Sequence, residues 1–124
     1  MTVEPKILVR EALAAFQSKD RDRTAELIAE LDRTNAPIGT TWGPIARMAN
    51  AVGEARLALS AMRRNAADLP DDLDRQLELA NMLAGNNRVE EAIAFGRSLV
   101  RRWPDHPSTH HFVGYVAAMS GATD

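Results

Sequence analysis

The sequence contains no cysteine, which excludes disulfide bonds and thiol chemistry. Aromatic residues make up only 5% of it, and no apolar run approaches the roughly 18 residues that a membrane-spanning helix needs. The N-terminal segment MTVEPKILVR also lacks the basic-then-apolar order of a secretory signal. We therefore expect a cytoplasmic protein that has no membrane partner.

An excess of one charge is lacking as well. The chain has 15 Lys and Arg against 17 Asp and Glu, which gives a formal net charge of −2. A nucleic-acid-binding domain is normally strongly basic, so no nucleic-acid partner is expected. The remaining composition, 45% apolar and 26% charged, is typical of a packed globular protein.

Recognisable catalytic motifs are also missing. No nucleophile stands beside a base, and no pair of carboxylates is suitably placed. The clearest turn, Gly85-Asn86-Asn87, connects two helical patterns, whereas a phosphate-binding loop would follow a strand. We expect no enzymatic activity and no cofactor.

Three histidines cluster near the C-terminus, and His106 and His110 have the i, i+4 spacing of two metal ligands on a helix. No carboxylate or cysteine completes such a site, and His106 precedes Pro107, outside the predicted helix. The favoured interpretation is a polar helix start, and no metal is expected.

What the sequence does contain is an internal repeat, most complete from Leu73 to Pro104. This segment predicts two amphipathic helices joined by a short polar turn and closed by a proline. One 34-residue shift superposes Ala46 and Ala80, Ala58 and Ala92, Ile45 and Leu79, and Pro70 and Pro104. A further shift places Ala80 on Gly114, so about three and a half units are expected.

Helical spacing of apolar residues, capping residues and helix breakers predict seven helices and no strand. The expected ranges are 4–18, 21–33, 40–52, 54–67, 73–85, 89–102 and 107–120. The predicted fold is all-α, in a single domain over residues 1–124. Candidate N-caps are Asp20, Thr40 or Thr41, and Asp71 or Asp72.

The first unit keeps the period only approximately. Ala12 precedes Ala46 by one full period, but Ala25 precedes Ala58 by one position less than a period. Either the turn between its two helices has one extra residue and the next connection one fewer, or its first helix is displaced by one position.

A 34-residue unit of two helices, with small residues at fixed places, resembles the tetratricopeptide repeat. The resemblance covers nearly the whole chain and implies an α-solenoid of antiparallel helical hairpins. In that family the first helix of each unit lines a concave surface that holds another polypeptide, and the second helices form the convex back. Ala46, Ala80 and Gly114 match the place where paired helices approach closely. Gly96 and Asn65 depart from the pattern, which favours an aromatic and a small apolar residue there.

The resemblance implies that the concave groove is the peptide-binding site. Its candidate residues are Leu13, Phe16, Arg47, Asn50, Leu77, Asn81, His111 and Tyr115. In the displaced register the first unit would instead present Arg10, Ala14 and Gln17. The planar, charged guanidinium of Arg47 can bind a carboxylate, and the asparagine amides can form hydrogen bonds with the backbone of a ligand. The expected ligand is a segment with an acidic residue beside apolar ones. The arginines of the second helices, Arg63, Arg64, Arg97, Arg101 and Arg102, are expected to form a solvated back.

These features predict a protein–protein interaction scaffold that binds a protein or peptide segment in its concave groove. The alternative is the interaction segment of a larger enzyme such as a transferase, because tetratricopeptide repeats are found fused to such catalytic domains. The last helix carries Phe112, Val113, Val116 and Met119 without a partner helix, so an exposed apolar strip is expected. Either a second copy covers this strip, giving a homodimer through the C-terminal helix, or the chain is part of a longer protein.

Overall fold

The computed structural model describes residues 3–121. In this part of the chain it is all-α, with 78% helix and no strand, as predicted. Its helices are α1 (Pro5–Gln17), α2 (Arg21–Arg33), α3 (Trp42–Ala51), α4 (Ala55–Asp68), α5 (Leu73–Gly85), α6 (Val89–Arg102) and α7 (Pro107–Met119), with a 3-10 turn η1 (Gly39–Thr41) before α3. None of the described helices combines the length and the apolar character needed to cross a membrane.

Helix boundaries recur with a 34-residue period along the described chain. The elements that open each 34-residue repeat begin at residues 5, 39, 73 and 107. The first helix of each repeat ends at residue 17, 51, 85 or 119. A residue with positive φ follows each first helix, and these residues are Lys19, Gly53, Asn87 and Gly121, again one period apart. A left-handed residue at this place ends a helix by letting the following N–H groups reach the last carbonyls.

The first hairpin also keeps this period, which removes the expected irregularity. Its turn spans three residues, like the turns of the other hairpins, and Thr24 rather than Ala25 occupies the place of Ala58 and Ala92. The Thr24 side chain is fully buried and donates its hydroxyl to Asp20 O at 2.7 Å. The extra residue in the turn and the displaced first helix are therefore both wrong explanations. A pattern of apolar residues overlooks a buried threonine whose hydroxyl is hydrogen-bonded to the backbone.

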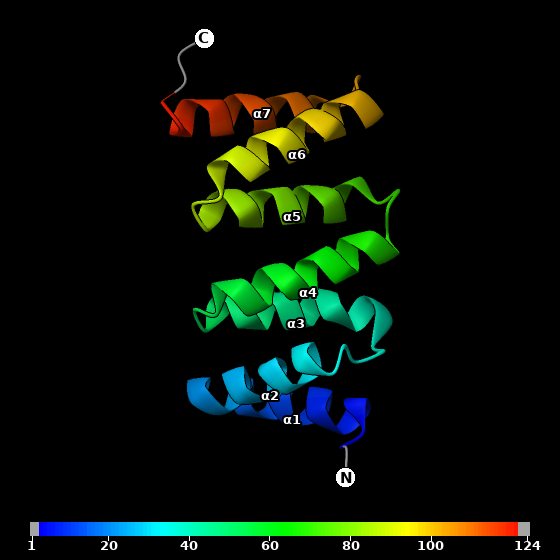
Figure 1. Ribbon diagram of the computed structural model, residues 1–124, viewed down its shortest axis with the longest axis vertical. Helices are drawn as coiled ribbons and strands as arrows, with labels where there is room; N and C mark the ends of the chain where they lie inside the picture. Colours follow the sequence, from blue (N-terminus) through cyan, green and yellow to red (C-terminus); the bar gives the residue numbers. More distant parts are fainter. Residues whose placement is uncertain (1–2, 122–124) are drawn as a thin grey trace. The chain divides into compact units, whose positions relative to one another are not determined.

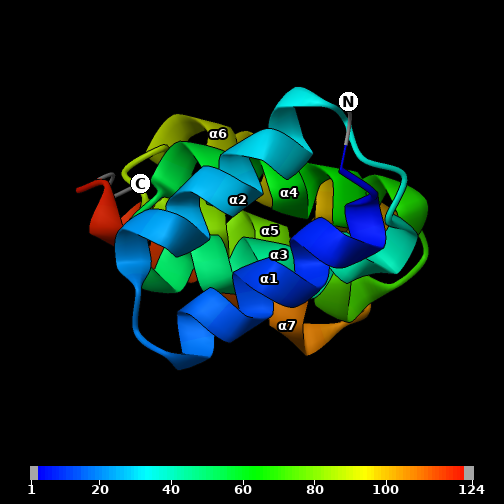
Figure 2. The same cartoon turned by 90° about the horizontal axis from the view of Figure 1, so that it is seen from below.

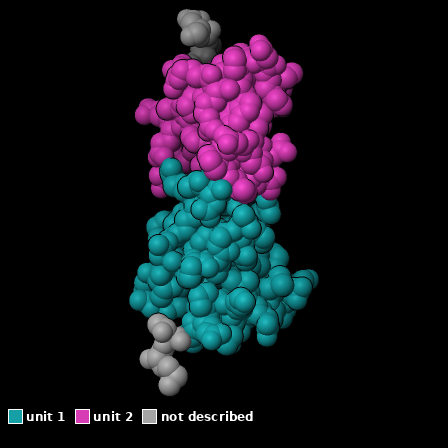
Figure 3. Space-filling model, turned by 90° about the vertical axis from the view of Figure 1, so that its right-hand side faces the viewer, with its two compact units in different colours: residues 1–68 teal, residues 69–124 magenta. Residues whose placement is uncertain are grey.

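The chain divides into two compact units, Met1–Asp68 and Leu69–Asp124 (Figure 3). Unit 1 contains the hairpins α1/α2 and α3/α4, whereas unit 2 contains the hairpin α5/α6 and the single helix α7. The single domain expected over residues 1–124 stays a prediction.

In unit 1, α1 pairs with α2 and α3 with α4, and α2 also packs on α3 and α4 (Figures 1 and 2). The largest fully buried apolar side chains are Ile28, Leu31, Ile45 and Met62. Asn65 is buried too, opposite Gly43, where an added Cβ would lie 3.1 Å from Asn65 Nδ2. The glycine of α3 thus makes room for the asparagine that departs from the repeat pattern.

A polar clasp joins α2 to α4 in unit 1. Asp32 accepts hydrogen bonds from Ser60 Oγ at 2.6 Å and from an Arg64 guanidinium nitrogen at 2.7 Å. That guanidinium also lies 4.3 Å from the centroid of the Trp42 ring. Partial burial of Asp32 raises its pKa, but the hydrogen bonds from Ser60 and Arg64 and the charges of Arg64 and Arg56 outweigh burial and hold the pKa below its usual value. Arg64 is therefore not the freely solvated arginine that was expected.

In unit 2, α6 packs against both α5 and α7, and α5 also contacts α7 (Figure 1). Phe112 and Val116 of α7 are buried. A Cβ at Gly96 would lie 3.1 Å from Val113 Cγ2, so a glycine there lets α7 approach α6 closely. The expectation that the whole apolar strip is exposed is wrong for Phe112 and Val116, and Met119 remains half exposed at 50%.

Side chains cap helices in both units. Asp20 caps α2 and Asp72 caps α5, each by accepting from the backbone N–H three residues later. His106 caps α7 through its ring Nδ1, which accepts from the backbone N–H two residues later. The expected side-chain cap of α3 is wrong at Thr41, whose side chain makes no such bond, and the 3-10 turn Gly39–Thr41 leads into the helix instead.

Candidate functional site

A hollow of about 660 Å³ opens between α5 and α7 of unit 2. It is lined by Leu77 and Asn81 of α5 and by Pro107, Ser108, His111, Phe112 and Tyr115 of α7. Both helices are first helices, the kind on which the groove was expected. Four of the eight predicted groove residues therefore line one hollow.

These four residues form two pairs, each related by the repeat. Leu77 and His111 are separated by one 34-residue period, and so are Asn81 and Tyr115. Within each helix the two side chains are one turn apart and share a face. Because α5 and α7 run in the same direction (Figure 1), the equivalent positions of the two helices meet at the hollow.

The hollow has an apolar floor and a rim of hydrogen-bonding groups. Phe112 is buried and Leu77 half-buried, whereas Asn81, His111 and Tyr115 are exposed, with Tyr115 at 54%. Asn81 Nδ2 donates to Leu77 O at 3.0 Å, which holds the amide against its own helix and leaves its Oδ1 as an acceptor. The Tyr115 hydroxyl can donate and accept. This rim suits the backbone of another polypeptide.

No Asp, Glu, Lys or Arg is among the described residues that line this hollow. A charged ligand group would find no carboxylate, lysine or arginine within it. The acidic ligand expected from Arg47 therefore has no counterpart in the hollow of unit 2, because Arg47 belongs to unit 1.

The other four predicted groove residues lie on the first helices of unit 1. Leu13 is exposed on α1, and Arg47 and Asn50 are exposed on α3. Phe16 is half-buried and lines a second hollow of about 480 Å³ with the turn after α1 and the C-terminal end of α3. The lining of that hollow does not include Leu13, Arg47 or Asn50. The 34-residue recurrence of the helix boundaries keeps Leu13 and Phe16 in register with Arg47 and Asn50, so the displaced register is wrong.

Sequence reasoning missed three lining residues of the hollow in unit 2. Pro107 and Ser108 lie four and three residues before His111, so they share its helix face, and this spacing would have identified them. Phe112 was assigned to the exposed strip, because the sequence alone does not show that Gly96 lets α7 turn this ring inward.

The histidine cluster forms no metal site in the part of the chain that the structure describes. His106 caps α7, and His110 Nε2 lies 2.6 Å from Pro104 O. His111 instead lines the hollow. The interpretation of His106 as a polar helix start is confirmed.

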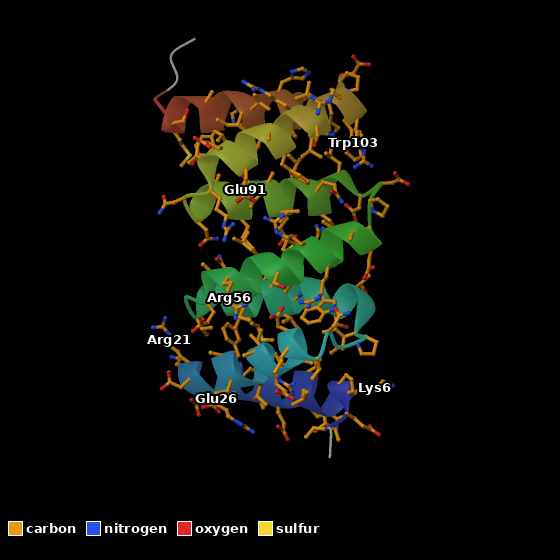
Figure 4. The ribbon with its side chains drawn as sticks, viewed as in Figure 1. Lys6, Arg21, Glu26, Arg56, Glu91 and Trp103 are labelled. Carbon is orange, nitrogen blue, oxygen red and sulfur yellow. The ribbon has the colours of Figure 1, made fainter. Side chains whose placement is uncertain are left out.

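The arginines of α6 differ from one another. Arg102 donates to Pro70 O, and its guanidinium lies 4.3 Å from the ring centroid of Trp103, at the C-terminal end of α6 (Figure 4). Arg97 and Arg101 are exposed and make no hydrogen bond or ion pair with another described residue. Arg101 therefore provides a control position away from the hollow.

No model of a known protein family, no curated protein and no solved structure matches the chain. The function is therefore inferred from the geometry of the two units, in which the hollow between α5 and α7 gathers the most candidate residues.

Proposed function

We propose that the protein is an interaction scaffold that holds a segment of another protein in the hollow between α5 and α7. The observation that carries this proposal is the gathering of Leu77, Asn81, His111 and Tyr115 around one hollow of about 660 Å³. An apolar floor with a few convergent polar groups is typical of binding sites of this size. A peptide segment offers both the apolar side chains and the backbone groups that such a surface can bind.

The chain is further proposed to be an α-solenoid of the tetratricopeptide type. Support comes from the elements that open each repeat at residues 5, 39, 73 and 107 and from the positive-φ residues that follow each first helix. In unit 1, Leu13, Phe16, Arg47 and Asn50 would form the corresponding face of the first helices, where Arg47 would favour an acidic residue of a ligand. The cytoplasm remains the expected compartment.

Binding rather than catalysis is proposed because the hollow holds no hydrogen-bonded pair of nucleophile and base among its described residues. Within the described chain, the Asn81 side chain donates only to its own helix. Within a larger enzyme the same surface would have the same role, which is to hold a polypeptide.

The proposal can be tested with a peptide-library screen on the full chain, followed by affinity measurements for the selected peptide. Tyr115→Ala should weaken binding about tenfold or more, because it removes the most exposed aromatic contact of the hollow. Asn81→Ala should weaken it by a smaller factor. Arg101→Ala is the matched control on α6 and should leave the affinity unchanged.

Circular dichroism of each variant separates loss of binding from loss of folding. Equal weakening by the hollow variants and by Arg101→Ala would contradict the assignment. So would a selected peptide whose affinity depends on neither Tyr115 nor Asn81.

A further inference from the structure

The outer face of α7 differs from the same face of the other first helices. Ala46 of α3 and Ala80 of α5 are fully buried. Gly114 occupies the equivalent place in α7, yet it is exposed, and an added Cβ would meet no atom within 4 Å. Ala117 is half-buried, whereas its equivalents Ala49 and Leu83 are buried. Positions that are core in one helix are therefore uncovered in α7.

This uncovered face also lacks the charge that a solvated face carries. The α7 sequence, PSTHHFVGYVAAM, contains no Asp, Glu, Lys or Arg. By contrast α1, another first helix, carries Lys6, Arg10 and Glu11 on its exposed surface. The end of a helical stack normally needs a polar outer face to stay in solution. The composition of α7 is therefore that of a helix to be covered.

Two hairpins of the same chain show what covers this face elsewhere. In α3/α4 and in α5/α6 the cover is the second helix of the hairpin, which runs antiparallel to the first (Figure 1). Both covering helices have 14 residues, and the fourth residue of each, Ala58 or Ala92, is fully buried. The shape that fits is an antiparallel amphipathic helix with a small residue near its start.

We propose that the outer face of α7, defined by Gly114 and Ala117, docks one amphipathic helix of a partner protein. The helix lies antiparallel to α7 and places a small residue against Gly114. This surface is separate from the hollow and does not depend on the function proposed for it.

A second copy of the chain fits this face less well than a partner helix. With 13 residues, α7 is about 20 Å long and 10 Å wide, so α7 packed on α7 covers far less than the roughly 800 Å² per partner of a stable dimer. Within unit 1, α4 packs on α2 as well as on α3. A single helix docked in the same way reaches α6 as well as α7.

The chain provides its own probe, a synthetic peptide of residues 88–103, which contains the helix that covers α5. It would be titrated into the isotopically labelled full chain and followed by NMR. Saturable shifts are expected at the amides of Gly114 and Ala117. The same peptide with Ala92→Leu should bind about tenfold more weakly, because overpacking of a close helix contact costs about 1–3 kcal/mol.

Two variants at one position make the test specific. Gly114→Leu should weaken peptide binding about tenfold, whereas Gly114→Ala should retain it, because the equivalent Ala46 and Ala80 accept a helix. A Cβ at Gly114 meets nothing in the free protein, so both variants should fold, which circular dichroism checks. Tyr115→Ala should leave this binding unchanged while it weakens the ligand of the hollow.

Three results would overturn the proposal. The first is the absence of saturable shifts on α7, and the second is equal binding by Gly114→Leu and the wild type. The third is a concentration-dependent dimer in light scattering that Gly114→Leu disperses, because a second copy would then be the occupant.

Discussion

Unit 1 and unit 2 are built from elements of the same 34-residue period, yet they bury equivalent positions differently. In unit 1 both first helices have a second helix, and Ala12 and Ala46 are fully buried. In unit 2 only α5 is followed by a described second helix, α6, so Ala80 is buried and the equivalent Gly114 is exposed. The place of a residue in the repeat therefore does not determine its burial, because each hairpin is covered only by its neighbours.

The two units also differ in how far the side chains of their ion pairs are buried. The Asp32 and Arg64 side chains in unit 1 are only 18% and 25% exposed, and they join α2 to α4. In unit 2, Arg102 lies 3.4 Å from the carboxylate of Asp71, whose side chain is 98% exposed. A partly buried pair is screened less by water than an exposed one. Unit 1 thus holds the more buried of these two ion pairs, and unit 2 contains the hollow and the outer face of α7.

The largest expected effect is in the cores, where a matched pair of substitutions compares the units. Leu31→Ala in unit 1 should cost about 3–5 kcal/mol, and Leu99→Ala in unit 2 about 2–3 kcal/mol. Both leucines are almost fully buried, but the three helices of unit 2 can close around a cavity more easily than the four helices of unit 1. Hydrogen exchange resolved by residue gives the free energy of opening in each unit. A larger loss in unit 2 would contradict the comparison.

A smaller effect is expected from the clasp of unit 1 and from its dependence on pH. Arg64→Ala should cost about 1–2 kcal/mol at pH 7, because it leaves a partly buried carboxylate with fewer partners. The pKa of Asp32 is lowered in the folded state, so the unfolded state binds its proton more readily. This contribution to stability is present above the unfolded pKa and is lost as the pH falls through the folded pKa.

The pH dependence has its own measurement and control. Denaturant unfolding at pH 7 and at pH 3 should show a smaller acid loss in Asp32→Asn than in the wild type. Asp71→Asn in unit 2 is the matched control, because it removes the carboxylate of an exposed ion pair. Equal effects of the two substitutions would remove the distinction between the clasp and an exposed ion pair.

Much of the fold could be predicted from the sequence, because local rules determine it. Apolar spacing located all seven described helices. Asp20 was identified as a cap, and Asp72 was one of two candidates for another. Side-chain packing was less predictable. The buried hydroxyl of Thr24 looks polar in a pattern, and the burial of Phe112 depends on the room that Gly96 leaves for α7. The four groove residues of the hollow could be predicted, because the 34-residue period places them at equivalent positions of α5 and α7.

The N-caps provide a comparison of about equal effect in both units. Asp20→Ala in α2 and Asp72→Ala in α5 should each cost about 1 kcal/mol, because each side chain satisfies an N–H group in the first turn of its helix. Asp→Ser at either position should recover most of the loss, since serine caps a helix similarly. Thermal unfolding provides the measurement. A loss that serine does not recover would indicate a role other than capping.

The smallest effect is expected at the glycines of unit 2, and its sign distinguishes the covered from the uncovered surface. Gly114→Ala should stabilise unit 2 by up to about 1 kcal/mol, because alanine favours a helix and its Cβ meets no atom within 4 Å. At Gly96 the same substitution should lose this benefit, because the new Cβ would lie 3.1 Å from Val113 Cγ2 and overpacking opposes the gain in helix propensity. Hydrogen exchange of α6 and α7 measures both changes. Stabilisation by both substitutions would mean that α7 packs on α6 less closely than described, and destabilisation by Gly114→Ala would mean that its outer face is already covered in solution.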